Sequence, residues 1–277
     1  MAITFQSSQT ATFAGNSLTI TKPTSTAVGD LLVATISSQS AMTSVPSGWT
    51  LITSKASLNN YAITYTYYVL ATSTQTAATN FTWGSTSTTV MAGGISRISG
   101  EFYSTPVDVF ASGSQSDGSS SLNYAITVTP NNANSILMFT ISQGSNTNSV
   151  AASVSSYAIT TSNPSWTEAY EGHVTFSSTA SVHNSMAYAT RTQITATGNA
   201  TATTNSGSQS SSIMLVIRPK VSFEFSETIT TAETRMKTVN KLFSDSVSLV
   251  ETISQKLGRL WTTVTKPVTT WINKIKP

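Results

Sequence analysis

Few residues of this chain could carry acid–base or metal chemistry. The only two histidines, His173 and His183, are ten residues apart, and their nearest acids are Glu168 and Glu171. This separation is no known metal spacing for a helix or a hairpin, so we expect two surface histidines on a β-loop. The chain has no cysteine, which removes disulfides, thiolate chemistry and cysteine zinc sites.

Motifs for nucleophilic or phosphate chemistry are equally scarce. Serine and threonine occupy 96 positions, so a Ser-His-Asp triad could be assembled from almost any fragment and carries no information. The phosphate loop Gly-x-x-x-x-Gly-Lys-Ser/Thr is absent, and no aromatic and basic strand pattern indicates nucleic-acid binding. We therefore predict a protein that is not an enzyme, with no catalytic residue, cofactor or metal. The other acids of residues 1–219 are scattered and mostly near turns: Asp30, Glu101, Asp108 and Asp117.

Aromatic residues offer one binding chemistry, sugar stacking. The candidates are Trp49, Trp83 and Trp166, with Tyr61, Tyr65 and Tyr67. Trp49 and Trp166 each follow a Pro-Ser turn, which favours a role in core packing over a role in binding. We expect a receptor-binding patch, where there is one, in the Ser/Asn/Gly loops at 113–121 or 144–149.

The elements that position these residues are predicted to be β-strands. Apolar runs alternate with Ser/Thr/Gly/Asn stretches, the pattern of a sandwich or barrel. Examples are residues 31–36, 61–69, 136–141 and 213–217. Charged residues make up 9% of the chain and apolar residues 39%, too apolar for a disordered Ser/Thr tract. No apolar run is long enough for a transmembrane helix, and the first residues predict no secretory signal.

Four landmarks occur twice in the same order, offset by roughly 105 to 120 residues. The pairs are 31–37 with 136–142, 44–50 with 162–167, 67–71 with 186–190, and 93–98 with 214–219. We therefore predict one β-sandwich over residues 1–219, closed by two sequence-related halves at about 1–110 and 111–219. The reason is that a single half would leave an apolar face uncovered.

A series of landmarks runs along the chain: Gly29-Asp30-Leu31-Leu32-Val33-Ala34, Pro46-Ser47-Gly48-Trp49-Thr50-Leu51-Ile52, Tyr67-Tyr68-Val69-Leu70-Ala71, Phe81-Thr82-Trp83, Gly94-Ile95 and Pro106-Val107-Asp108. At these landmarks the chain resembles a β-sandwich module found in bacteriophage virion proteins and in large secreted bacterial surface proteins. The resemblance covers about residues 18–219. It implies an all-β, jelly-roll-like fold with a display or adhesion role.

Residues 220–277 follow a different pattern, with nine basic and five acidic residues. A heptad repeat starts at Met236, and ten of its twelve core positions are apolar. We predict a helical, coiled-coil-like segment from about 231 to 265 that forms a homo-oligomer, a trimer as first choice. Strands are the alternative, since Ser/Thr residues are frequent here and Pro267 should end or kink a helix. The proposed oligomerisation residues are Phe243, Val247, Val250, Leu257, Trp261 and Val264.

Composition also bears on function. A nearly uncharged Ser/Thr surface has few trypsin sites and little to titrate, which suits a particle exposed to unregulated surroundings. We therefore expect a structural or display protein of a bacteriophage virion, such as a capsid decoration, head fibre or tail component. Its partners would be capsid or tail proteins and a host-surface glycan. The alternative is an extracellular bacterial cell-surface module that binds carbohydrate or acts as an adhesin.

Overall fold

The computed structural model describes residues 2–115, 121–145, 153–161, 163–176, 180–204, 209–220, 252–257 and 260–265. Contacts divide the chain into two compact units, Met1–Glu224 and Phe225–Pro277, so the division falls close to the composition change at Pro219. The described part is almost entirely antiparallel β-structure, as the all-β prediction requires.

The first half of the larger unit is a curled sheet with the strand order β1-β6-β2-β5-β4, in which β3 also pairs with β6. Its strands are β1 (Thr4–Thr21), β2 (Leu31–Ser38), β3 (Met42–Ser44), β4 (Thr50–Ala56), β5 (Ile63–Leu70) and β6 (Asn80–Ser99). A short helix, α1 (Ser73–Ala77), begins with a capping box formed by Thr72 and Gln75. Because β1 and β6 are long and shift register near Gly15, they bend over a core that contains Trp49 and Trp83.

The second half contains a five-stranded sheet and a three-stranded sheet. The five-stranded sheet has the order β11-β12-β9-β14-β7 and consists of β11 (Thr167–Phe176), β12 (Ala180–Arg191), β9 (Ser135–Ser145), β14 (Gln209–Ile217) and β7 (Val107–Gln115). The three-stranded sheet has the order β10-β13-β8 and consists of β10 (Val154–Ile159), β13 (Ala200–Thr204) and β8 (Ser121–Tyr124). Phe139, Leu122 and Tyr124 lie in the core between these two sheets.

The two halves share one strand order. The path β1-β6-β2-β5-β4 corresponds, strand by strand, to β7-β14-β9-β12-β11. Each of the four repeated sequence landmarks lies on, or directly before, a corresponding strand; Trp49 precedes β4 as Trp166 precedes β11. Both of these strands shift register at the same place, just after the tryptophan, at Leu51–Thr53 and at Glu168–Tyr170. Sequence and topology therefore repeat together.

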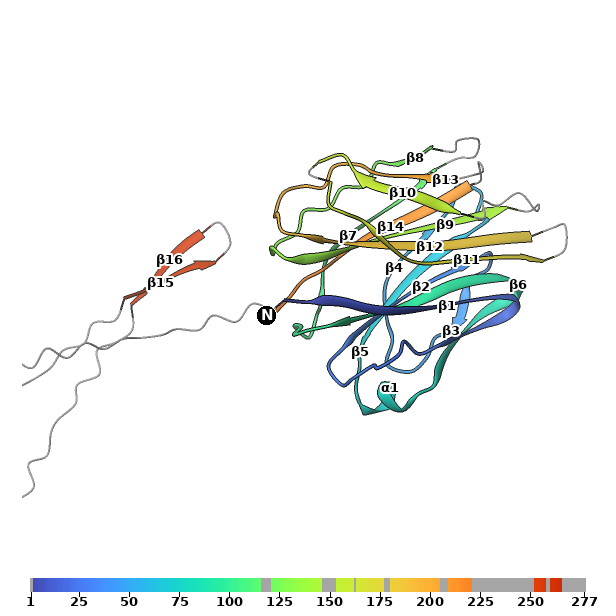
Figure 1. The fold of residues 1–277 in the computed structure, drawn as a ribbon, viewed down its shortest axis with the longest axis horizontal. Coiled ribbons are helices and arrows are strands. Elements are labelled where there is room, and N and C mark those ends of the chain that lie inside the picture. Colours follow the sequence, from blue (N-terminus) through green and yellow to red (C-terminus); the bar gives the residue numbers. More distant parts are fainter. Residues whose placement is uncertain are drawn as a thin grey trace, which may run out of the picture. The chain divides into compact units, whose positions relative to one another are not determined.

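The two main sheets also pack against each other, so that the second half covers the first (Figure 1). Contacts between them come in equivalent pairs: β1 contacts β11 as β7 contacts β4, and β6 contacts β12 as β14 contacts β5. This is the pattern of surfaces related by a two-fold axis. Ser37 and Ser142, which occupy equivalent positions on β2 and β9, are hydrogen-bonded to each other across this contact.

This arrangement differs from the expectation that two halves close one sandwich. Each half encloses a core of its own, and a third core lies between the main sheets. The physical reason is visible in β2 and β9, whose residues are all buried, because both faces of each main sheet are covered. The change from the first sheet to the second falls between Ser99, the last residue of β6, and Val107, the first of β7.

The smaller unit contains an antiparallel hairpin of β15 (Thr252–Leu257) and β16 (Leu260–Thr265). At these residues the structure has strands, which were the alternative to the predicted helix. The remainder of the helical segment predicted for about 231 to 265 lies outside the described residues, where it stays a prediction. Of the proposed oligomerisation residues, Leu257, Trp261 and Val264 lie on the hairpin, while Phe243, Val247 and Val250 lie outside the described residues.

Candidate functional site

A groove opens at one edge of the second half, where β10 is the edge strand of the smaller sheet and β11 is the edge strand of the larger one. We call it the edge groove; its volume is about 630 Å³, within the usual range of small-molecule sites. It is lined by Ser155, Ser156, Tyr157, Asn163, Pro164, Ser165, Trp166 and Glu168. The groove therefore combines two aromatic rings with hydroxyl groups and one carboxylate.

The two aromatic rings of the edge groove rest on the core of the second half. Tyr157 and Trp166 both contact Phe139, with ring centroids 5.8 Å and 6.2 Å from it. The Trp166 indole N–H donates to Asn163 Oδ1 at 2.9 Å, and the same oxygen accepts the backbone N–H of Ile159 at 3.0 Å. The indole is thus held in a fixed direction while one part of it stays exposed.

Tyr157 is placed by an irregularity in β10. The pairing of β10 with β13 shifts between Ser155 and Ala158, and Ser156 has a φ of 54°, a left-handed conformation that a non-glycine residue adopts only when its surroundings hold it there. The Tyr157 hydroxyl is buried and has no hydrogen-bond partner. It lies beside the fully buried Ser185 of β12, so it faces the interior of the second half.

Two carboxylates lie on β11 on either side of its register shift. Burial raises the pKa of Glu168, and the negative charge of Glu171 adds to this effect. Burial by itself would raise the pKa of Glu171. The contact with His183, the hydrogen bond from the Val154 N–H and the charge of the His183 imidazole outweigh burial, so the pKa of Glu171 is lowered. Glu171 accepts a hydrogen bond from the Val154 N–H, so this side chain connects β11 to the first residue of β10.

The structure changes the interpretation of the two histidines. His173 and His183 lie directly opposite each other on β11 and β12. In the register of this hairpin, residues 173 and 183 form a cross-strand pair. His183 is fully buried rather than on a surface loop, and its Nε2 lies 3.5 Å from Glu171 Oε1 without a hydrogen bond at either ring nitrogen. Burial lowers the pKa of His173, and the charge of His183 lowers it further.

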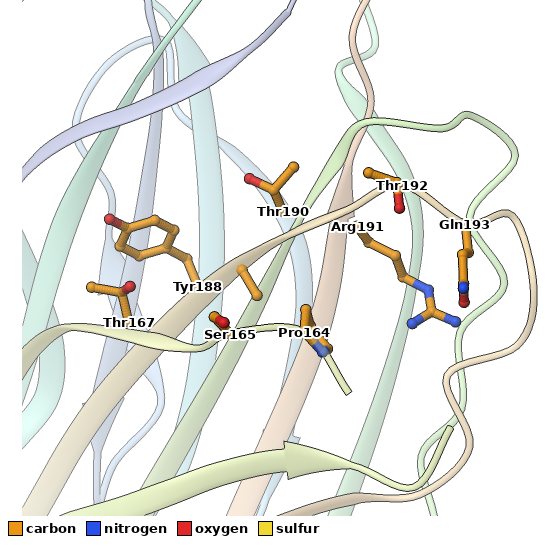
Figure 2. A pocket seen from close by; sticks show the side chains of 9 residues that line it. Pro164, Ser165, Thr167, Tyr188, Thr190, Arg191, Thr192 and Gln193 are labelled. Carbon is orange, nitrogen blue, oxygen red and sulfur yellow. The ribbon is translucent and has the colours of Figure 1, made fainter. Parts of the chain in front are cut away.

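A second depression, which shares Pro164 and Ser165 with the edge groove, is shown in Figure 2 and has a volume of about 480 Å³. Tyr188 and Arg191 lie at its two ends. Tyr188 stacks on Phe5 with ring centroids 3.8 Å apart, and the buried Arg191 guanidinium donates to the carbonyl oxygens of Thr195 and Ala196. These two side chains are therefore occupied by structural contacts.

The first half has a corresponding depression of about 410 Å³, lined in part by Thr50 and Tyr68. Register makes these residues the equivalents of Thr167 and Tyr188. Since this depression appears in both halves, it follows from the repeated fold. The edge groove is different, because Trp166 is partly exposed there whereas its equivalent Trp49 is buried in the core. We therefore take the edge groove as the candidate site.

One of the aromatic residues singled out in the sequence, Trp166, lines this site. Trp49 is a core residue, as expected, and Trp83 lies in the same core. Trp166, for which a core role was also expected, belongs both to the core margin and to the groove. Most of the loops at 113–121 and 144–149 lies outside the described residues. The sequence interpretation missed Tyr157 and Asn163; the available signal was the change from Pro-Ser-Gly-Trp in the first half to Asn-Pro-Ser-Trp in the second.

Within the described residues, no three His, Asp or Glu side chains are grouped so as to hold a metal ion. A search of the same residues finds no helix that is long and apolar enough to span a membrane. No protein-family model, curated protein or solved structure matches the chain. Fold and groove therefore carry the functional argument.

Proposed function

We propose that this protein is a non-enzymatic structural and display component of a bacteriophage virion, a capsid decoration, head fibre or tail component that also adheres to the host surface. Its body is a jelly-roll-like β-sandwich module used twice. The repeated strand order, the shared register shift after each tryptophan and the two-fold contact support descent of the two halves from one module.

One observation carries the proposal: beside the apolar core between the two main sheets, buried hydroxyl and amide groups are hydrogen-bonded to one another across the contact. Asn184 donates to Ser37 at 2.7 Å and to Ser142 at 3.1 Å, and Thr35 donates to Asn184 Oδ1 at 3.2 Å. Thr64 and Ser211 form another buried pair at 2.7 Å. Such groups do not titrate between acid and alkaline pH, and salt screens them little. This is a suitable interior for a protein displayed in unregulated surroundings.

The segment after Glu224 completes the proposal. We assign it the role of joining copies into a homo-oligomer, with a trimer as first choice, or of anchoring the body to capsid or tail proteins. Its basic residues and its apolar heptad positions support an assembly role. The body would then be the displayed part.

The test is the location of the protein. Virions of the phage that encodes it are purified by density gradient, and the protein is measured by quantitative mass spectrometry and located by immunogold electron microscopy. We expect a fixed copy number per particle and labelling on the particle surface. Absence from purified particles, with labelling of the bacterial envelope instead, would favour the alternative of a secreted cell-surface carbohydrate-binding or adhesin module.

A further inference from the structure

We propose that the edge groove is a carbohydrate-binding site that takes a pyranose unit which is neutral or carries an amine, and that it does not take acidic sugars. The inference deepens the adhesion part of the proposed function, because it assigns that adhesion to a site and a ligand class. A host-surface glycan bound here would be recognised by shape, stacking and hydroxyl contacts.

The first argument is the exposed indole. A pyranose ring presents a face of C–H groups, and a flat aromatic side chain offers the complementary apolar surface. Trp166 is partly exposed in the groove, and its N–H is already used by Asn163 at 2.9 Å. What remains free is the apolar ring, held in a fixed direction, so that a stacked ligand would lose little conformational entropy of the protein on binding.

The second argument is the polar lining beside the indole. Ser155, Ser156 and Ser165 add exposed polar groups along the same groove. This mixture of one stacking surface and several hydroxyls fits a polyol better than an apolar ligand.

The third argument is charge. Glu168 lines the groove and Glu171 lies behind it, whereas no lysine or arginine is among the described lining residues. A carboxylate, sulfate or phosphate on the ligand would face like charge without a compensating cation. A neutral sugar can donate its hydroxyl protons to Glu168, and an amino sugar can form an ion pair with it. The groove therefore selects against sialic and uronic acids.

The nearby depression between Tyr188 and Arg191 provides the matched control. Tyr188→Phe removes one hydroxyl from that depression and leaves the lining of the edge groove unchanged. Glu168→Gln removes the groove carboxylate at an exposed position and should leave the fold intact. Each variant is checked by circular dichroism and thermal unfolding before binding is measured.

The experiment applies the full chain to a glycan array with neutral hexoses, N-acetylhexosamines, free hexosamines, and sialylated and uronic oligosaccharides. The best spot is then titrated by calorimetry. We expect neutral or amine-bearing glycans to bind, with Glu168→Gln weakening binding by roughly fivefold or more and Tyr188→Phe binding like the wild type. Trp166→Ala should abolish binding.

Other results overturn the inference. They are the absence of binding to every glycan by the folded full chain, a preference for acidic glycans, and equal weakening by Glu168→Gln and Tyr188→Phe. Failure of the proposed function is recognised separately. If the protein is absent from purified virions while the groove variants still weaken glycan binding, only the virion role falls. If the protein releases new reducing ends from the bound glycan, only the non-enzymatic assignment falls.

Discussion

Individual small residues determine how closely the two main sheets approach each other. A Cβ atom at Gly144 would overlap the carbonyl oxygen of Tyr61, and a Cβ at Gly94 would overlap the ring of Tyr170. Backbone cannot move aside as the end of a flexible side chain can. The glycines on β9 and β6 are therefore required for a close contact between sheets.

Gly144→Ala tests this close approach. We expect the free energy of unfolding to fall by about 2–4 kcal/mol, because the added methyl group must push two backbones apart in a packed core. Gly29→Ala is the control: its φ of 91° makes alanine strained, but nothing lies near its Cβ, so its loss should be only about 1 kcal/mol. Urea unfolding measures both. Equal losses would show that the contact at Gly144 can relax.

Asn184 tests the hydroxyl and amide layer. Asn184→Ala removes three buried hydrogen bonds, to Thr35, Ser37 and Ser142, and should cost about 1–3 kcal/mol of unfolding free energy. Thr19→Ala, which breaks an exposed hydroxyl pair with Thr82, should cost less than about 0.5 kcal/mol. Denaturant unfolding of the two variants compares them. A loss at Asn184 no larger than that at Thr19 would contradict a stabilising role for this layer.

At the scale of elements, the edge groove depends on how β10 is held against β11. The first backbone N–H of β10, at Val154, donates to Glu171 of β11. The left-handed Ser156 follows two residues later and brings Tyr157 into the groove. Glu171 thus acts as a positioning residue for the groove, although it is not among the residues that line it.

Glu171→Gln tests this connection through its pH dependence. The pKa of Glu171 is lowered in the folded protein, so its carboxylate stabilises the fold above the usual glutamate range, and that stabilisation is lost as the pH falls through the lowered value. At neutral pH we expect the wild type to be more stable than the variant. In acid the difference should vanish.

Chemical denaturation at a series of pH values measures this difference. Glu168 and His173 also titrate nearby and are present in both proteins. Because the charge of Glu171 raises the pKa of Glu168, the measured difference reports Glu171 together with its effect on Glu168. A difference that stays constant from neutral to acid pH would mean that the carboxylate charge does not stabilise the connection.

At the scale of the whole molecule, the chain combines a body with few charges and a basic C-terminal segment. Within the described residues the body has two ion pairs that involve arginine, Arg97 with Asp30 at 2.6 Å and Arg218 with Asp108 at 3.9 Å. Both pairs are largely buried, with side-chain exposures of 14% and 8% in the first and 28% and 1% in the second, so salt screens them little. The stability of the body should therefore depend on apolar burial and neutral hydrogen bonds.

Salt dependence checks this view. Between about 50 mM and 500 mM sodium chloride, we expect the melting temperature of the full chain to change by less than about 3 °C, because there is little charge interaction to screen. Differential scanning fluorimetry measures it, with an uncharged osmolyte series of equal osmolality as the control. A steep fall with salt would mean that ion pairs stabilise the fold.

Removal of residues 225–277 tests the assembly role. Light scattering should give the full chain a mass that is a multiple of 29.2 kDa, three times that value as first expectation, and the truncated protein the mass of one copy. The truncated protein should keep its β-sheet circular dichroism, since residues 1–224 form a compact unit. A monomer mass for both proteins would end the oligomer hypothesis and leave anchoring as the role of the segment.

Much of the fold was predictable from local patterns. Strands were expected where apolar runs alternate with Ser/Thr-rich stretches, and the repeat landmarks proved to lie on corresponding strands. Such patterns depend on neighbours along the chain, so the sequence reports them directly. The core position of Trp49 was predicted from its place in a landmark that recurs, since it follows a Pro-Ser turn as Trp166 does.

Sequence alone thus determined the all-β class, the repeat and the scarcity of titratable groups. Only the tertiary structure decided that each half encloses a core of its own, that His173 faces His183, and that Tyr157, Trp166 and Glu168 line one groove. These features depend on strand register and on contacts between edges far apart in the chain. Register is set by the packing of whole sheets, which no short stretch of residues encodes.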